Sequence, residues 1–120
     1  MNNKKILICD DDEGILDMLE LILEDSGYDI IAERNSLNVK SIIDREHPDL
    51  ILLDLWMPVL SGDQVLKSLR KNSKTQYLPV IIISASTEGQ KIADESGANA
   101  FIAKPFNFDE LIQKIEHYIS

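Results

Sequence analysis

The sequence contains a single cysteine and no long apolar segment. Cys9 has no second cysteine with which to form an internal disulfide, which suits a reducing compartment. The apolar run near the N-terminus, Ile6–Cys9, is too short for the core of a signal peptide, and no run approaches the roughly 18 apolar residues of a membrane span. We therefore expect a soluble protein of the cytoplasm that makes no membrane contact.

Basic residues are scarce as well. The chain has 12 lysines and arginines against 21 aspartates and glutamates, so its formal net charge is −9. A protein this acidic lacks the positive surface that holds nucleic-acid phosphates or anionic lipid headgroups. The composition therefore predicts no direct contact with nucleic acid.

No repeat, low-complexity tract or linker interrupts the chain. Its 120 residues are 44% hydrophobic and 28% charged, which is close to the average for globular proteins and argues against disorder. This length corresponds to one domain with a core of reasonable size. We expect residues 1–120 to form a single domain.

Short aliphatic runs predict the strands of a sheet. Ile6–Cys9, Leu50–Leu53 and Val80–Ile83 are continuously apolar, which is typical of parallel strands buried on both faces. Tyr28–Ala32 and Ala100–Ala103 are weaker and fit the two edges of the same sheet. The sequence thus predicts five strands, three of them central.

Segments with helical periodicity alternate with these strands. Right-handed crossovers through such helices give an α/β protein with helices on both faces of a parallel sheet. Either Asn107 or Asp109 is the N-cap of the last helix. The apolar stripes and the turn signals place the five helices around Ile15–Leu23, Val39–Ile43, Val65–Leu69, Glu88–Ser96 and Leu111–Ile119.

Polar residues stand where four of the strands end. Ligands in such folds bind beyond the carboxyl ends of the strands, so the ends of the first, third, fourth and fifth strands mark the candidate site. These residues are Asp10, Asp54, Ser84 and Lys104.

The carboxylates at this edge suggest a cation site. Asp54 and the run Asp10–Glu13 would crowd together, which raises carboxyl pKa values unless a cation neutralises the charge. Oxygen ligands with room for water suit Mg²⁺. The alternative is that the acidic run simply caps the next helix, whose dipole favours negative charge at that end.

With these residues in order, the chain resembles a receiver domain of the response regulators of two-component signalling. The resemblance covers the whole chain and implies a flavodoxin-like, doubly wound, five-stranded parallel sheet of order 2-1-3-4-5 with five helices. The motifs that carry it are Ile6–Asp11, Leu53–Pro58, Ser61-Gly62, Pro79–Ala85, Gly97-Ala98 and Lys104-Pro105-Phe106.

The resemblance implies a role for each site residue. Asp54 would accept a phosphoryl group, and Lys104 and Ser84 would hold that group. Asp10, Asp11, Asp54 and the backbone carbonyl of Trp56 would bind Mg²⁺. The donor would be a sensor histidine kinase or a histidine phosphotransfer protein. The expected reaction is a Mg²⁺-dependent transfer of the phosphoryl group from the donor to Asp54, followed by slow self-dephosphorylation, so the chain is not expected to be an enzyme.

Further expectations concern signalling. Ser84 and Phe101 would form a switch that alters a surface for an unknown protein target, although Phe101 has the alternative of being an ordinary aromatic residue of an edge strand. Trp56 would shield the phosphoryl group from water or, alternatively, only pack on the loop.

The segment from Ser84 to Gly97 is short for the family, which predicts a short fourth helix. The Lys104-Pro105 peptide bond is expected to be cis.

Rival functions fit the sequence less well. A phosphatase resembling the haloacid dehalogenases needs a second acid two residues after the nucleophile, where this chain has Trp56. A flavin-binding flavodoxin cradles phosphate after its first strand, where Asp10–Glu13 would repel it. An adaptor that works without phosphorylation stays open. Since the chain ends at Ser120, we expect a module without an output domain, which is a single-domain regulator, a phosphorelay intermediate or a piece of a hybrid kinase.

Overall fold

A five-stranded parallel sheet forms the centre of the computed structural model, which describes residues 3–119. The strand order is β2-β1-β3-β4-β5, as expected. The three continuously apolar runs are the central strands, and the two weaker runs are the edges. The strands are β1 (Lys5–Cys9), β2 (Asp29–Glu33), β3 (Leu50–Asp54), β4 (Val80–Ser84) and β5 (Ala100–Ala103).

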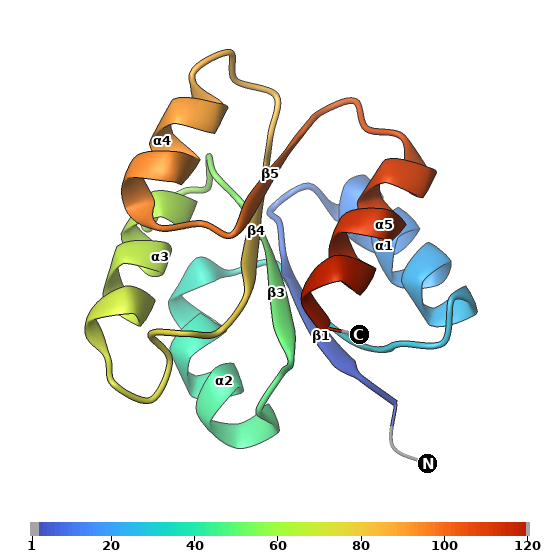
Figure 1. The fold of residues 1–120 in the computed structure, drawn as a ribbon, viewed down its shortest axis with the longest axis horizontal. Coiled ribbons are helices and arrows are strands. Elements are labelled where there is room, and N and C mark those ends of the chain that lie inside the picture. The colour runs from blue at the N-terminus through green and yellow to red at the C-terminus, as the bar shows by residue number, and fades with distance from the viewer. Residues whose placement is uncertain (1–2, 120) are drawn as a thin grey trace.

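Helices cover both faces of the sheet (Figure 1). Two of them, α1 and α5, lie on one face, and α2, α3 and α4 lie on the other. A short 3₁₀ turn, η1, precedes α2. The bounds are α1 (Glu13–Asp25), η1 (Ser36–Asn38), α2 (Val39–Glu46), α3 (Gly62–Lys71), α4 (Gly89–Ser96) and α5 (Phe108–Ile119).

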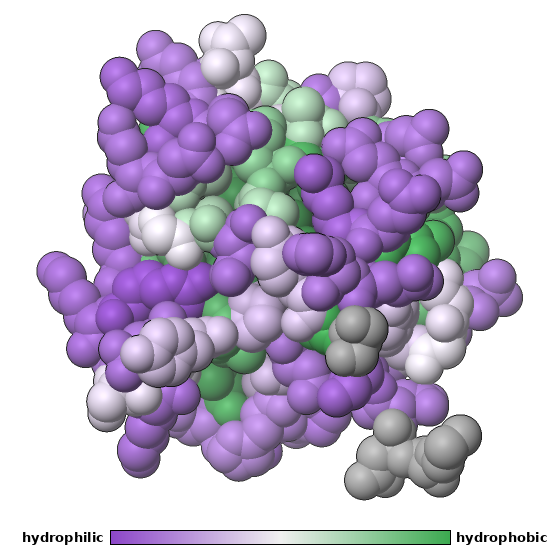
Figure 2. All heavy atoms as spheres, viewed as in Figure 1, coloured by the Kyte–Doolittle hydropathy of each residue, from purple (hydrophilic) through white to green (hydrophobic). Residues whose placement is uncertain are grey.

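The sheet separates two hydrophobic clusters. Side chains alternate along each strand, so Ile6 and Ile8 of β1 pack beneath α1 and α5 while Leu7 and Cys9 pack beneath the other helices. Both faces of the central strands are therefore buried, which is why their sequences are continuously aliphatic. Figure 2 shows one side of the molecule in the same view as Figure 1, and hydrophilic residues cover most of the surface there. Within residues 3–119, no helix is both long and apolar enough to cross a membrane.

The helix ends follow the turn signals of the sequence. Gly27 after α1 has φ 97° and Gly97 after α4 has φ 93°, and both values are conformations that side chains disfavour. At the start of α5, the side-chain oxygen of Asn107 accepts hydrogen bonds from the backbone of Asp109 at 2.8 Å and of Glu110 at 3.2 Å. Asn107 is therefore the cap, and Asp109 lies in the first turn.

The fourth helix is short, as expected, with eight residues. Half-buried Arg70 of α3 secures its C-terminal end. The Nε atom of Arg70 donates to the carbonyl of Gly97 at 2.9 Å, while its two Nη atoms donate to Leu78 and to the side chain of Asn99, each at 2.8 Å. The C-terminal end of α4 is thus held to α3 and to the start of β4.

Candidate functional site

Three carboxylates meet at the carboxyl edge of the sheet. Asp54 is the last residue of β3, and Asp10 and Asp11 directly follow β1. Because Cys9 pairs with Leu53 in the sheet, the residues after them emerge side by side. One oxygen from each of the three aspartates lies within 4.8 Å of the others. Asp10 and Asp54 are buried and Asp11 is exposed, so the cluster opens to solvent on one side.

Lys104 joins this cluster from the edge strand. Its Nζ atom donates to Asp10 at 2.9 Å and to Asp54 at 3.3 Å. Burial by itself would lower the pKa of Lys104, but the hydrogen bond to Asp10 and the charges of both aspartates raise it above the ordinary value. Lys104 therefore stays protonated and places its positive charge in contact with Asp54. The Lys104-Pro105 peptide bond is cis, as expected.

Asp54 is electrostatically unusual. Burial, followed by the negative charge of Asp10, raises the pKa of its carboxyl group from 3.8 to about 6, although Lys104 opposes the shift. Three carboxylates face a single lysine, so the cluster holds more acidic than basic groups. A divalent cation would relieve this excess.

The acidic run after β1 divides between two roles. The side chain of Asp12 accepts backbone hydrogen bonds from Gly14 at 2.9 Å and Ile15 at 3.2 Å, so Asp12 is the N-cap of α1. The carboxylate of Asp10 accepts from the backbone of Asp12 at 2.9 Å. The helix-capping interpretation is thus correct for Asp12, and the cation-site interpretation suits Asp10 and Asp11.

Ser84 and Phe101 lie close together beside this cluster. Ser84 ends β4, is fully buried, and accepts a hydrogen bond from the backbone of Ser86 at 3.0 Å. A β-carbon built on Gly89, the first residue of α4, would come within 2.7 Å of the Phe101 ring and 3.1 Å of the Ser84 side chain. Gly89 therefore leaves the space that the ring occupies. Sequence reasoning missed this residue, whose only signal was a glycine at a helix start.

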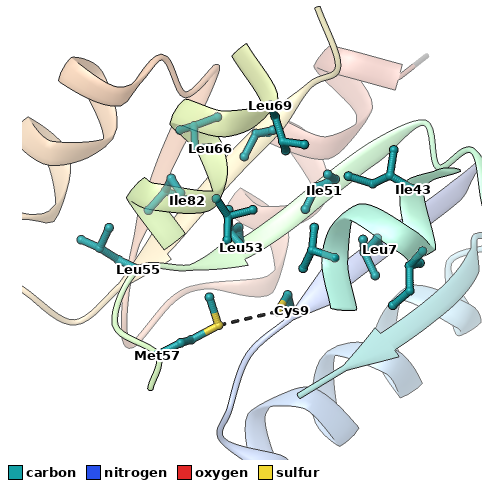
Figure 3. Packing of buried hydrophobic residues seen from close by; sticks show 14 of the residues in the cluster. Leu7, Cys9, Ile43, Ile51, Leu53, Leu55, Met57, Leu66, Leu69 and Ile82 are labelled. Carbon is teal, nitrogen blue, oxygen red and sulfur yellow. Dashed lines mark hydrogen bonds between the residues drawn. The ribbon is translucent and has the colours of Figure 1, made fainter. Parts of the chain in front are cut away.

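The loop after Asp54 alternates between buried and exposed side chains. Leu55 and Met57 are buried, and the thiol of Cys9 donates to the Met57 sulfur at 3.6 Å (Figure 3). Burial raises the pKa of Cys9 to about 12, with smaller contributions from nearby carboxylates, so its thiol is inert. Trp56, which lies between Leu55 and Met57, is 55% exposed. Its ring is therefore open to solvent, while its backbone follows Asp54 by two residues in the chain.

The donor set fits a hard divalent cation. Three carboxylates, at least one of them open to solvent, resemble the sites that suit Mg²⁺, which binds through few protein oxygens and keeps several waters. Among residues 3–119, no cysteine or histidine joins this cluster to favour a softer metal. The predicted residues Asp10, Asp11, Asp54 and Lys104 are thus brought together, with Ser84 on the neighbouring strand.

Comparison with known proteins shows that the sequence of this chain matches one family. The model of the response regulator receiver domain matches residues 6–116. The chain is 35% identical to the alkaline phosphatase synthesis transcriptional regulatory protein PhoP of Bacillus subtilis, covering 95% of this chain and 48% of PhoP. It is 31% identical to the polar-differentiation response regulator DivK of Brucella ovis, covering 97% of this chain and 96% of DivK. The chain therefore spans about half of PhoP and nearly all of DivK.

Solved structures of receiver domains have the same fold as this chain. The receiver domain of the sensor histidine kinase PA1611 from Pseudomonas aeruginosa superposes with a TM-score of 0.90 at 25% identity, covering 98% of each chain. That structure has a magnesium ion coordinated in its active site cleft.

Proposed function

Because this chain belongs to the response regulator receiver domain family, we propose that Asp54 accepts a phosphoryl group and that residues 1–120 form one receiver domain. Receiver domains are the phosphoacceptors of two-component signalling. The observation that carries the assignment is that Asp54 is itself buried, belongs to the carboxylate cluster and has Lys104 Nζ at 3.3 Å. A lysine there can compensate the charge of a group bound to Asp54.

The proposed reaction moves one phosphoryl group between two proteins. A carboxylate oxygen of Asp54 forms a bond to phosphorus while the bond from phosphorus to the histidine nitrogen of the donor breaks, and that nitrogen keeps the electron pair. Lys104 then contacts the phosphoryl oxygens, and the Ser84 hydroxyl donates a hydrogen bond to one of them. Such reactions depend mainly on positioning and charge neutralisation. Hydrolysis later returns Asp54 to a carboxylate, which is slow self-chemistry rather than enzymatic turnover.

A bound Mg²⁺ would neutralise the excess charge of the carboxylates and of the phosphoryl oxygens. Asp10, Asp11, Asp54 and the backbone carbonyl of Trp56 are the proposed ligands. The carboxylate cluster supports this assignment, and so does the magnesium ion in the PA1611 receiver domain.

The proposed donor is a sensor histidine kinase or a histidine phosphotransfer protein. An apolar cleft of about 460 Å³ beside Lys104 supports this choice, since Ile15 and Met18 of α1 line it together with Phe106 and Phe108. An apolar helix face of the donor would cover these side chains and bring its histidine to Asp54.

We propose the cytoplasm as the setting, in line with the single cysteine. The excess of acidic residues supports a downstream protein target rather than direct contact with nucleic acid or membrane.

Ser84 and Phe101 are the proposed switch. A Ser84 hydroxyl that turns toward the phosphoryl group would leave its hydrogen bond with Ser86 and vacate space. The Phe101 ring, which lies against Gly89 in this structure, would rotate into that space. Phe101 carries no hydroxyl, so the change is transmitted by packing alone. The surface formed by α4, β5 and α5 would then differ between the two states.

Mass measurement tests the phosphoacceptor. Wild-type protein incubated with Mg²⁺ and a small acyl phosphate should gain the mass of one phosphoryl group. Asp54→Asn should abolish the gain, whereas Asp44→Asn, which changes an exposed aspartate of α2, should retain it. A phosphoryl gain that persists in Asp54→Asn would contradict the proposal. Turnover of small phosphoesters would instead support the phosphatase alternative.

Trp56 is expected to prolong the phosphorylated state. If its exposed ring shields the acyl phosphate, Trp56→Ala should lose phosphate faster, by roughly threefold or more, because water gains access. The decay of the phosphorylated mass with time measures this rate. Tyr77→Ala is the matched control, since Tyr77 is an exposed aromatic residue just before β4, at the opposite edge of the sheet. An unchanged or slower rate in Trp56→Ala would leave only the loop-packing alternative.

A further inference from the structure

The loop after Asp54 contains a strained turn. The backbone N–H of Leu60 donates to the carbonyl of Pro58 at 2.8 Å, and Val59 between them has φ 69°. This is a three-residue turn with a positive central φ, which is costly for a β-branched side chain. The Val59 side chain is 83% exposed and contributes almost no packing in return. Contacts outside Val59 must therefore stabilise this turn.

Ser36 supplies such a contact from another part of the chain. Its hydroxyl donates to the carbonyl of Leu60 at 2.6 Å, and the Ser36 side chain is buried. Ser36 is the first residue of η1, and its orientation is supported by Asn35, whose side chain accepts from the backbone of Leu37 at 3.0 Å. The bond thus connects the segment after β2 to the turn after β3.

The same two segments border the proposed metal site. A cleft of about 440 Å³ is lined by Asp11, by residues on both sides of Ser36, and by Pro58 and Val59. The backbone of Trp56 enters this loop two residues before Pro58. A change in the turn would therefore alter the position of the Trp56 carbonyl relative to Asp11 and Asp54.

We propose that Ser36 is a positioning residue of the acceptor site, whose hydroxyl holds the strained Pro58–Leu60 turn and thereby places the Trp56 carbonyl for Mg²⁺. This inference rests on the proposed function, because it assigns the metal to the same cluster. Ser36 itself does not touch the reacting atoms. Its effect passes through the Leu60 carbonyl and the backbone of the loop.

Magnesium-dependent stability tests the inference without measuring phosphorylation. Urea unfolding midpoints recorded at increasing Mg²⁺ give an apparent affinity that is separate from the stability of the metal-free protein. Ser36→Ala should weaken this affinity by about 3- to 10-fold, the range expected for one lost hydrogen bond. Ser41→Ala is the matched control, because the Ser41 hydroxyl also donates to a carbonyl, that of Asn38, but is exposed on α2. Its Mg²⁺ affinity should equal that of the wild type.

A second substitution separates positioning from simple packing. Val59→Gly removes the strain, so Ser36→Ala made in that background should change the Mg²⁺ affinity by less than about twofold. Equal effects of Ser36→Ala in both backgrounds, or an unchanged affinity in the single variant, would overturn the inference. If wild-type protein showed no stabilisation by Mg²⁺, the metal site of the proposed function would fail instead. The two failures are therefore distinguishable.

Discussion

Gly62→Ala is expected to lower the free energy of unfolding by about 3 kcal/mol, at the upper end of the usual cost of overpacking. A β-carbon at Gly62, the first residue of α3, would collide with the carbonyl oxygen of Asp54. The obstacle is backbone, so no side chain can rotate away. The backbone N–H of Gly62 also donates to the Leu55 carbonyl at 2.8 Å, which holds the start of α3 against the end of β3.

Chemical denaturation measures this loss, and Gly14→Ala provides the matched control. Gly14 also lies in the first turn of a helix, but a β-carbon there would meet only the Asp12 side chain at 3.4 Å, an ordinary contact. Alanine favours a helix over glycine by up to about 1 kcal/mol, so this control should be neutral or slightly stabilising. If Gly62→Ala were equally well tolerated, the close approach of α3 to Asp54 would be wrong.

Asp54→Asn is expected to stabilise the magnesium-free protein by about 1 to 2 kcal/mol near neutral pH. The raised pKa of Asp54, about 6, means that folding places this carboxylate where burial and Asp10 disfavour its charge. Asparagine removes the charge and keeps the shape. The expected gain in the free energy of unfolding is smaller than the value that corresponds to the whole pKa shift, because solvent screens part of the repulsion.

The stabilisation should depend on pH. A carboxyl group with a higher pKa in the folded state binds protons more tightly when folded, so acidification between about 6 and 3.8 protonates Asp54 preferentially in the folded protein. The cost of its charge is therefore present above pH 6 and fades as the pH falls toward 4. The difference between Asp54→Asn and wild type should shrink over the same range.

Denaturation across this pH range in the presence of a chelator provides the measurement. Added Mg²⁺ should then stabilise the wild type more than Asp54→Asn, because the variant lacks one ligand and much of the charge that the ion neutralises. Asp44→Asn, at an exposed position of α2, should show neither effect. A wild type that is more stable than Asp54→Asn at neutral pH without magnesium would contradict the electrostatic description of the site.

Periodicity and topology predicted most of the architecture. The three aliphatic runs could only be buried on both faces, which made them central strands, and the short segment before Gly97 predicted the short α4. The expected strand ends were within one residue of those observed; for example, β3 extends to Asp54 rather than Leu53. Caps were less certain, because Asn107 and Asp109 are both good capping residues and only the direction of their side chains distinguishes them.

The site residues were predictable because of one geometric rule. In a parallel sheet all strands point the same way, so Asp10, Asp54, Ser84 and Lys104 had to emerge at one edge once the strands were identified. The likeness to the receiver family added their roles. Neither argument indicated that Ser36 reaches Leu60 or that Gly89 makes room for Phe101, because these contacts join segments whose sequences carry no mutual signal.

The amino-acid sequence alone thus determined the parallel α/β architecture and the edge at which acid, hydroxyl and lysine collect, because strand direction and burial follow from local pattern. Only the tertiary structure decided which aspartate of the acidic run caps α1, that burial and Asp10 raise the pKa of Asp54, and where backbone approaches backbone at Gly62. These properties depend on distances of a few ångströms between residues far apart in the chain. No local pattern encodes such distances, and they arise only when the helices pack on the sheet.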